Sequence, residues 1–246
     1  MKKWFALMLT VTLAFSFFGE STFAKVSDAP IRVLSEEVEI KDIDELFERA
    51  KENVNDLDAN VIEDKLDASL TKEGGGASET AVDLISTSQL LKVSEKNDGT
   101  RLEEFAVTAF TADVGQQMAS GSSSRSASLW DESYSVRAYA TYYFTRHVKG
   151  DYTYHDITRA TGGWERADTS VTISQKKVIY GASGQRLKDS GYVQQSQTMY
   201  PSGNTFAYNA PSSWEPVITL HGVGVSTWVT MNRGRSTWTL KLVCQN

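Results

Sequence analysis

The sequence predicts a mainly β protein: an antiparallel β-sandwich or barrel-like domain preceded by a short acidic helical segment. From Ser88 onward, short runs alternate between apolar and polar residues and are separated by turn residues, which is typical of such folds. Upstream of Ser88, apolar residues recur at intervals of three and four, as on one side of a helix. The only cysteine is Cys244. An internal disulfide is therefore excluded, and the hydrophobic core has to supply the stability.

The first 24 residues are ordered like a secretory signal peptide. Lys2 and Lys3 precede an apolar run over residues 4–18, and small residues lead to a cleavage site after Ala24. This run is shorter than the ~20 residues of a spanning helix, and no second run of that length follows. We therefore predict cleavage after Ala24 and a secreted, extracellular product without a transmembrane span. A secreted chain with a single cysteine, and so without an internal disulfide, is typical of a Gram-positive exoprotein.

Charge is distributed unevenly along the chain. Residues 25–132 contain 11 Lys and Arg and 24 Asp and Glu, a net charge of −13, whereas residues 133–246 contain 12 and 6, a net charge of +6. In one interpretation the acidic segment is simply well solvated. In the other, it covers or regulates the basic part, which faces an anionic partner such as a cell-wall polymer.

Residues 25–76 are predicted to form an acidic, partly helical N-terminal segment. Residues 40–54 have the stronger pattern, and Asp42 followed by Glu45 resembles a capped helix start. Its apolar positions are Ile40, Ile43, Leu46, Phe47, Ala50 and Val54. A weaker helical pattern uses Val61, Ile62, Leu66 and Leu70. The glycines at 74–76 then interrupt regular structure, and we interpret them as a linker.

Residues 77–118 are predicted to be a β-hairpin region that packs on the main domain. The sequence Asn97-Asp98-Gly99 separates two strand-like runs, and glycine accepts the positive φ that a hairpin loop needs. A three-residue loop pairs Glu95 with Arg101, Lys92 with Glu104 and Leu91 with Phe105. A two-residue loop would set Lys96 opposite Arg101, a destabilising like-charge pair. The three-residue loop is therefore predicted, and residues 119–129 form a Ser-rich loop after it.

Residues 130–246 are predicted to form the antiparallel β domain, organised around a strand from Tyr134 to His147. Its even positions are mostly apolar, whereas its odd positions are Arg137, Tyr139, Thr141, Tyr143, Thr145 and His147. A two-residue turn at Gly150-Asp151 pairs Phe144 with Ile157. Further strands are predicted at residues 170–180, 191–200, 206–210, 217–220, 223–231 and 236–243, with turn signals that include Ser183-Gly184.

The last hairpin supports the β interpretation. With a turn at Arg233-Gly234, one face carries Val225, Val229, Met231, Trp238, Leu240 and Leu242. The other face is polar apart from Trp228. A slip of one residue would destroy this segregation, so the pairing is strongly specified.

Three stretches resemble segments of exported β-rich proteins of Gram-positive bacilli whose activity is uncharacterised. They are the hairpin at 89–108, the Ser-Val-Arg-Ala-Tyr strand at 135–139 and the stretch from Tyr200 to Trp214. The resemblance covers the β-rich half and the preceding hairpin. It implies secretion and a β fold, and it brings no activity or functional residue with it.

Recognisable catalytic and metal-binding motifs are missing from the sequence. In the Gly150-Asp151 register, His147 and His155 point to opposite faces, so they cannot share one metal ion. Neither a nucleophile elbow nor a His-Glu-x-x-His motif occurs. Neither a metal nor a cofactor is predicted, and the balance is against an enzyme. A hydrolase without a motif stays as an alternative, with Glu165 and Asp168 as its first candidates.

The aromatic side chains suggest a ligand site. The same register places Arg137 opposite Trp164, on one face with Tyr139, Tyr143 and Tyr154. The candidate ligand-binding residues are Arg137, Tyr139, Tyr143, Tyr154, Trp164 and Trp228. In the alternative interpretation this face is the inner side of a sandwich, where such rings pack together.

The function that these observations predict is secreted, non-enzymatic binding of a cell-wall polymer or another carbohydrate or anionic surface. One alternative is an antibacterial or pore-forming protein, in which a Ser/Thr-rich amphipathic hairpin inserts into a membrane. The other is the hydrolase without a motif. No nucleic-acid partner is predicted, and the sequence leaves the oligomeric state open.

Overall fold

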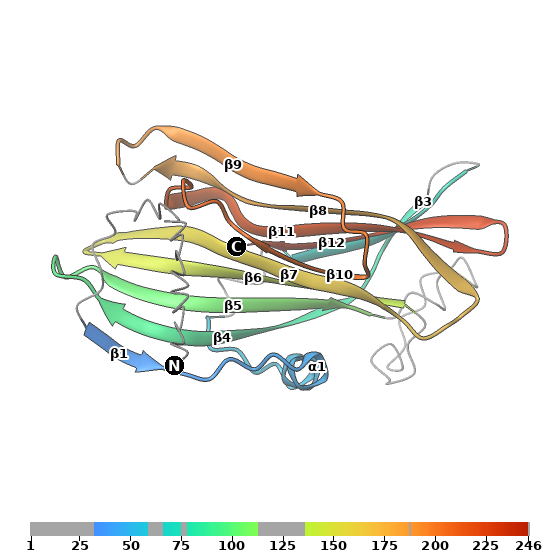
Figure 1. The fold of residues 1–246 in the computed structure, drawn as a ribbon, viewed down its shortest axis with the longest axis horizontal. Coiled ribbons are helices and arrows are strands. Elements are labelled where there is room, and N and C mark those ends of the chain that lie inside the picture. The colour runs from blue at the N-terminus through green and yellow to red at the C-terminus, as the bar shows by residue number, and fades with distance from the viewer. Residues whose placement is uncertain (1–31, 59–65, 75–77, 113–135, 187, 246) are drawn as a thin grey trace, which may run out of the picture.

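The computed structural model describes residues 32–58, 66–74, 78–112, 136–186 and 188–245. These residues form an antiparallel 12-stranded sheet that curls like half a barrel, together with one short helix (Figure 1). The predicted mainly β fold is therefore confirmed. None of the helical structure in the described ranges is long and apolar enough to cross a membrane. The predicted signal peptide and the Ser-rich loop at 119–129 lie outside the described residues.

The strands run in the order β1-β4-β5-β6-β7-β11-β12-β2-β3, with β10 also paired to β7, and β8 paired to β11 and β9. The elements are β1 (Arg32–Glu36), α1 (Ile43–Lys51), β2 (Leu66–Lys72), β3 (Ser78–Ala81), β4 (Leu84–Glu95), β5 (Arg101–Thr111), β6 (Val136–Lys149), β7 (Tyr152–Arg166), β8 (Val171–Arg186), β9 (Tyr192–Met199), β10 (Thr205–Asn209), β11 (Val217–Arg233) and β12 (Ser236–Gln245). A single pair, Val217 with His155, joins β11 to β7. At this joint the sheet folds over, so that β11 and β12 lie against β5 and β6, with which they do not pair.

The main core lies between the two layers of the folded sheet. The even face of β6 contributes to it, because Val136, Ala138, Ala140, Tyr142 and Phe144 are all at most 1% exposed. The apolar face of the last hairpin is buried opposite, which confirms the predicted segregation. Its turn is at Gly234-Arg235, one position later than predicted, and this shift leaves every side chain on its predicted face.

Helix α1 forms where the sequence predicts it, although it is shorter than expected. The Asp42 carboxylate caps it by accepting hydrogen bonds from the backbone N–H groups of Asp44 and Glu45, at 3.0 and 3.1 Å. Acidic residues occupy its first turn and basic residues its last, which complements the helix dipole. Its apolar face forms a second cluster with the outer face of the sheet, made of Leu46, Phe47, Ala50, Phe110 and Tyr139.

Two predicted elements are of the wrong type. Residues 66–72 form strand β2, which pairs with β12, instead of continuing a helix. Leu66 and Leu70 fit both patterns, because a spacing of four places residues on one face of a helix and also on one face of a strand. Ser183-Gly184 lies within β8, where it pairs with β11, and is not a turn.

The glycines at 74–76 lie between two paired strands. Gly74 has a φ of +90°, and Lys72 pairs with Ser78 on the far side of the connection. The described part of this stretch therefore belongs to a hairpin within the sheet. Gly75 and Gly76 themselves lie outside the described residues.

The first predicted hairpin has the expected three-residue loop. Glu95 pairs with Arg101 and Lys92 with Glu104, as the charges predict. A bulge at Leu91 then shifts the register, so that Leu90 and not Leu91 lies opposite Phe105. The Leu91 carbonyl accepts a hydrogen bond from the Glu37 backbone N–H at 2.8 Å.

Candidate functional site

The predicted aromatic row is divided by a bulge in β7. The two-residue turn holds, and His147 lies opposite Tyr154 and Phe144 opposite Ile157, as predicted. Thr158 is then an extra residue in β7, and the pairs beyond it move by one position. Trp164 consequently lies opposite Ala138 on the inner face, where it is 2% exposed, and Arg137 lies opposite Glu165. The prediction that Arg137 faces Trp164 is wrong for this reason.

The other predicted residues are also separated. Arg137 and Tyr139 lie beneath α1, and the Arg137 guanidinium is 4.1 Å from the centre of the Phe47 ring. Tyr154 is 8% exposed and its ring stacks on that of Tyr152. The two histidines do point to opposite faces. Within the described ranges, no group of three His, Cys, Asp or Glu side chains is placed to hold a metal ion.

What remains of the row forms the floor of a hollow that we call the tyrosine pocket. It has a volume of about 270 Å³ and lies on the outer face of β6, β7 and β10. The residues that define it are Tyr139, Thr141, Tyr143, Arg159, Thr161 and Thr205. Two of the predicted ligand residues, Tyr139 and Tyr143, are therefore brought together here.

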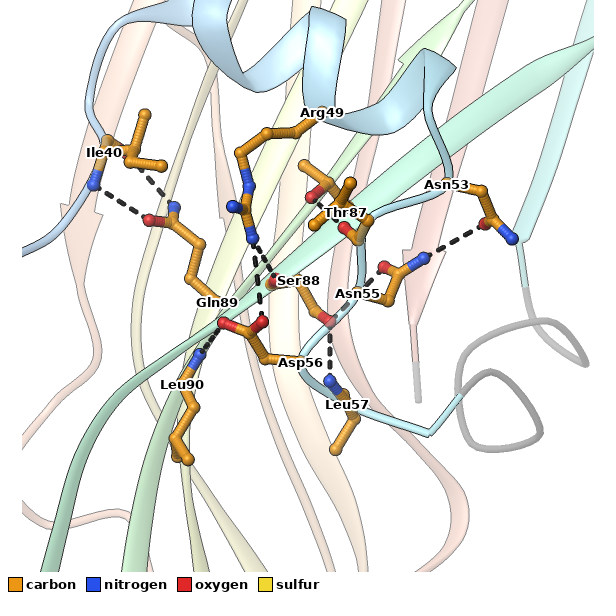
Figure 2. Close-up of polar contacts among 11 residues, drawn as sticks. Ile40, Arg49, Asn53, Asn55, Asp56, Leu57, Thr87, Ser88, Gln89 and Leu90 are labelled. Atoms are coloured by element: carbon orange, nitrogen blue, oxygen red, sulfur yellow. Dashed lines mark hydrogen bonds and ion pairs between the residues drawn. The ribbon is translucent and has the colours of Figure 1, made fainter. Parts of the chain in front are cut away.

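The roof of the tyrosine pocket is the segment 37–57, which we call the strap. It contains α1, and polar contacts hold it against β4 (Figure 2). The Gln89 side chain exchanges two hydrogen bonds with the backbone of Ile40, at 2.8 and 3.1 Å. Further along, the Asp56 carboxylate accepts from the Leu90 N–H at 3.0 Å, and the Ser88 hydroxyl accepts from the Leu57 N–H at 2.9 Å. Beyond the end of β1, the strap therefore provides hydrogen-bond partners for backbone groups at the exposed edge of β4.

Tyr143 joins the floor of the pocket to its roof. Its hydroxyl donates a hydrogen bond of 2.7 Å to the Glu39 carboxylate. Burial, together with this hydrogen bond, raises the pKa of Tyr143 to about 12. The tyrosine therefore stays protonated and keeps donating to Glu39 throughout the neutral range.

This raised pKa predicts how the stability changes at alkaline pH. Because the folded-state pKa of Tyr143 lies above its ordinary value of 10, its contribution is complete below pH 10 and is lost as the pH rises through about 12. The difference in unfolding free energy between the wild type and Tyr143→Phe should therefore shrink over this window. Urea unfolding at stepped pH measures it, beside an absorbance titration of tyrosinate. A constant difference across the window would contradict the prediction.

The second hollow lies on the outer face of the other layer, and we call it the tryptophan groove. Its volume is about 610 Å³, and it spans β8, β11 and β12 together with the stretch after β9. Its main side chains are Lys176, Lys177, Tyr200, Trp228, Thr230 and Thr239. The carboxylate of Glu73 also lines the groove, where it accepts a hydrogen bond of 2.9 Å from the Thr239 hydroxyl. Trp228, the sixth predicted ligand residue, is half-buried here, and Tyr200 is 75% exposed.

The cations of the tryptophan groove have no carboxylate partner among the described residues. The Lys177 ammonium lies 3.9 Å from the centre of the Trp228 ring, a cation–π contact. The Lys176 ammonium donates to the Ser202 carbonyl at 3.0 Å. Beside them, Ser174 and Gln175 oppose the single residue Thr230 in a bulge, which twists β8 locally.

Elsewhere, acidic residues of the N-terminal half neutralise cations of the C-terminal half. The ion pairs of this kind are Arg137–Asp44, Arg146–Glu103, Lys149–Asp98 and Lys241–Asp67. Lys176 and Lys177 take part in no such pair within the described ranges. The tryptophan groove therefore contains two adjacent lysines that form no ion pair with the acidic half.

The carboxylates of the hydrolase alternative are held in ion pairs. One oxygen of Glu165 lies 2.7 Å from both the Nε and a terminal nitrogen of Arg137. The hydroxyl and the backbone N–H of Ser170 lower the pKa of Asp168. A carboxylate with a lowered pKa is a poor general acid, because it is rarely protonated near neutral pH.

Fold and surface together define a class: a two-layer antiparallel β protein with an aromatic, cationic groove on one outer face and a roofed, hydroxyl-lined pocket on the other. In comparisons with protein families, with curated proteins and with solved structures, none matched this chain. Sequence reasoning missed Lys176, Lys177, Tyr200 and Arg159. The adjacent lysines within a strand were the one signal that could have indicated the groove.

Proposed function

We propose that this protein is exported and binds an anionic polysaccharide of the cell surface through the tryptophan groove, without breaking bonds in it. The observation that supports the proposal most is the combination of Trp228 and Tyr200 with two lysines that form no ion pair among the described residues. The predicted signal peptide supports export. The low pKa of Asp168 and the pairing of Glu165 with Arg137 favour binding over hydrolysis.

The chemistry of the groove suits such a ligand. Aromatic rings present a flat apolar face with a polar edge, on which a sugar ring can stack. Lysine ammonium groups attract phosphate or carboxylate groups of a polymer, and salt screens this attraction where it is exposed to solvent. The cation–π contact with Lys177 fixes the indole and places its charge beside it. Thr230 adds a hydroxyl group along the groove, whereas the hydroxyl of Thr239 already donates to Glu73 at 2.9 Å.

Removing the indole should weaken binding. We expect Trp228→Ala to bind purified Gram-positive cell wall at least about tenfold more weakly, about 1.4 kcal/mol, which is within the range that tryptophan anchors contribute at interfaces. The double variant Lys176→Gln/Lys177→Gln should weaken binding at low salt and reduce its salt dependence. Sedimentation binding isotherms at low and high salt measure both effects.

Tyr192→Ala is the matched control, because Tyr192 is an aromatic residue 56% exposed on β9 and does not line the groove. It should bind like the wild type. Failure of the wild-type protein to bind cell wall at either salt would overturn the proposal, as would unchanged binding by Trp228→Ala. Release of soluble sugar fragments from the wall would overturn its non-catalytic part.

A further inference from the structure

The tyrosine pocket contains a cation whose charge is not balanced by a neighbouring carboxylate. The Arg159 guanidinium is 5.2 Å from the centre of the Tyr143 ring. No ion pair joins Arg159 to a carboxylate within the described part of the chain. Arginine is always charged in proteins, and a partly buried cation without a counter-ion is unfavourable. An anion of matching shape would therefore be stabilised at this position.

The carboxylate of Glu39 lines the same pocket but is already engaged. It accepts the hydrogen bond from Tyr143, and the Lys41 ammonium lies 3.6 Å away from it. Lys41 thus offsets the negative charge of Glu39, and the positive charge of Arg159 is left without an offset. A ligand bound here would meet a guanidinium on the floor of the pocket and a hydrogen-bond acceptor at its roof.

The remaining lining suits a molecule with several hydroxyl groups and one apolar face. Thr141, Thr161 and Thr205 contribute hydroxyl groups, of which that of Thr141 already shares a hydrogen bond of 2.8 Å with Thr108. Ile40 and Ile43, both on the strap, contribute an apolar wall. The volume of about 270 Å³ is just below the ~300 Å³ at which pockets for drug-sized ligands begin. One sugar ring is therefore a better match than an oligosaccharide.

We infer that the tyrosine pocket binds a single acidic sugar unit, with its carboxylate on the Arg159 guanidinium and its hydroxyl groups directed to the threonines and Glu39. The planar guanidinium can hold a carboxylate through two parallel hydrogen bonds, which a lysine cannot reproduce. This site is on the opposite layer from the tryptophan groove and does not depend on the function proposed for that groove.

Calorimetric titration of the full chain with glucuronate, and with glucose as its neutral counterpart, tests this inference. Wild-type protein should bind glucuronate at least about tenfold more tightly than glucose, as expected when a charge-assisted pair is formed. Arg159→Met, which keeps the apolar stem, should lose this preference, and Arg159→Lys should retain only part of it. A trisaccharide that ends in glucuronate, run beside the free sugar, distinguishes a chain end from a free ligand.

Arg235→Met is the matched control. Arg235 is exposed at the β11–β12 turn, outside the pocket, and also has no carboxylate partner within the described ranges. It should bind glucuronate like the wild type, and so should Trp228→Ala, which separates this inference from the groove proposal. Three results would each overturn the inference. They are equal affinity for glucuronate and glucose, no binding of glucuronate either as the free sugar or at the end of the trisaccharide, and unchanged glucuronate binding by Arg159→Met.

Discussion

Replacing Phe144 by alanine should lower the free energy of unfolding by about 3–5 kcal/mol, the usual cost of removing a buried phenylalanine. Phe144 is 1% exposed at the centre of β6. Its ring is stacked between those of Phe105 and Tyr142, at centroid distances of 5.4 and 5.5 Å. The rigid sheet around it cannot collapse to fill the space, so the loss includes both the transfer of the ring and the cavity left behind.

Urea unfolding followed by tryptophan fluorescence measures this loss. Tyr200→Ala serves as the control, because this aromatic residue is 75% exposed and its removal should change the stability by no more than ~0.5 kcal/mol. Removing a buried ring usually lowers the free energy of unfolding by several times ~1 kcal/mol. A loss below ~1 kcal/mol for Phe144→Ala would therefore mean that the two layers do not pack across β6.

The central strand was predictable because its two faces differ in composition. The alternation from Val136 to Phe144 separates inner-face from outer-face residues correctly, and the Gly150-Asp151 turn sets the pairs next to it. The strap then buries the outer residues Arg137 and Tyr139 as well. The prediction fails at Thr158, where β7 contains one extra residue. A bulge has no distinctive sequence here, because Thr158 is an ordinary strand residue, and a shift of one position moves Trp164 to the opposite face.

The two candidate sites show a second limit of sequence reasoning. Trp228 could be identified because it interrupts the polar face of a hairpin, and Tyr139 and Tyr143 because they share a face of one strand. Arg159 lies beside Tyr143 only because the extra residue Thr158 shifts the register of the β6–β7 hairpin. Tyr200 reaches the groove at the end of β9, which pairs with the lysine-bearing strand β8. The strap depends on pairing over a longer range, since the position of α1 is set by contacts of residues 40 and 54–57 with β4, which lies more than 30 residues further along the chain.

Replacing Arg137 by methionine should destabilise the protein by about 3 kcal/mol, the lower end of the ~3–5 kcal/mol that results from removing one partner of a buried ion pair. The Arg137 residue is 3% exposed, and its guanidinium contacts one oxygen of Glu165. The side chain of Glu165 keeps 26% of its exposure, so water partly solvates the carboxylate left behind. The pair with Asp44 adds little, because the Asp44 side chain is 89% exposed.

This loss should be partly reversible by a second substitution, which distinguishes a stranded charge from simple loss of packing. In Arg137→Met/Glu165→Gln the carboxylate is neutralised, so we expect the double variant to be at least ~1 kcal/mol more stable than Arg137→Met alone. Glu165→Gln alone should be destabilising, because it leaves the guanidinium without its closest anion. If the two single effects simply add in the double variant, the ion pair does not stabilise this part of the fold.

Hydrogen exchange provides an independent readout of the same substitution. The Arg137 guanidinium packs on the Phe47 ring at 4.1 Å and so holds helix α1 against the sheet. The amides of α1 should therefore exchange faster in Arg137→Met than in the wild type.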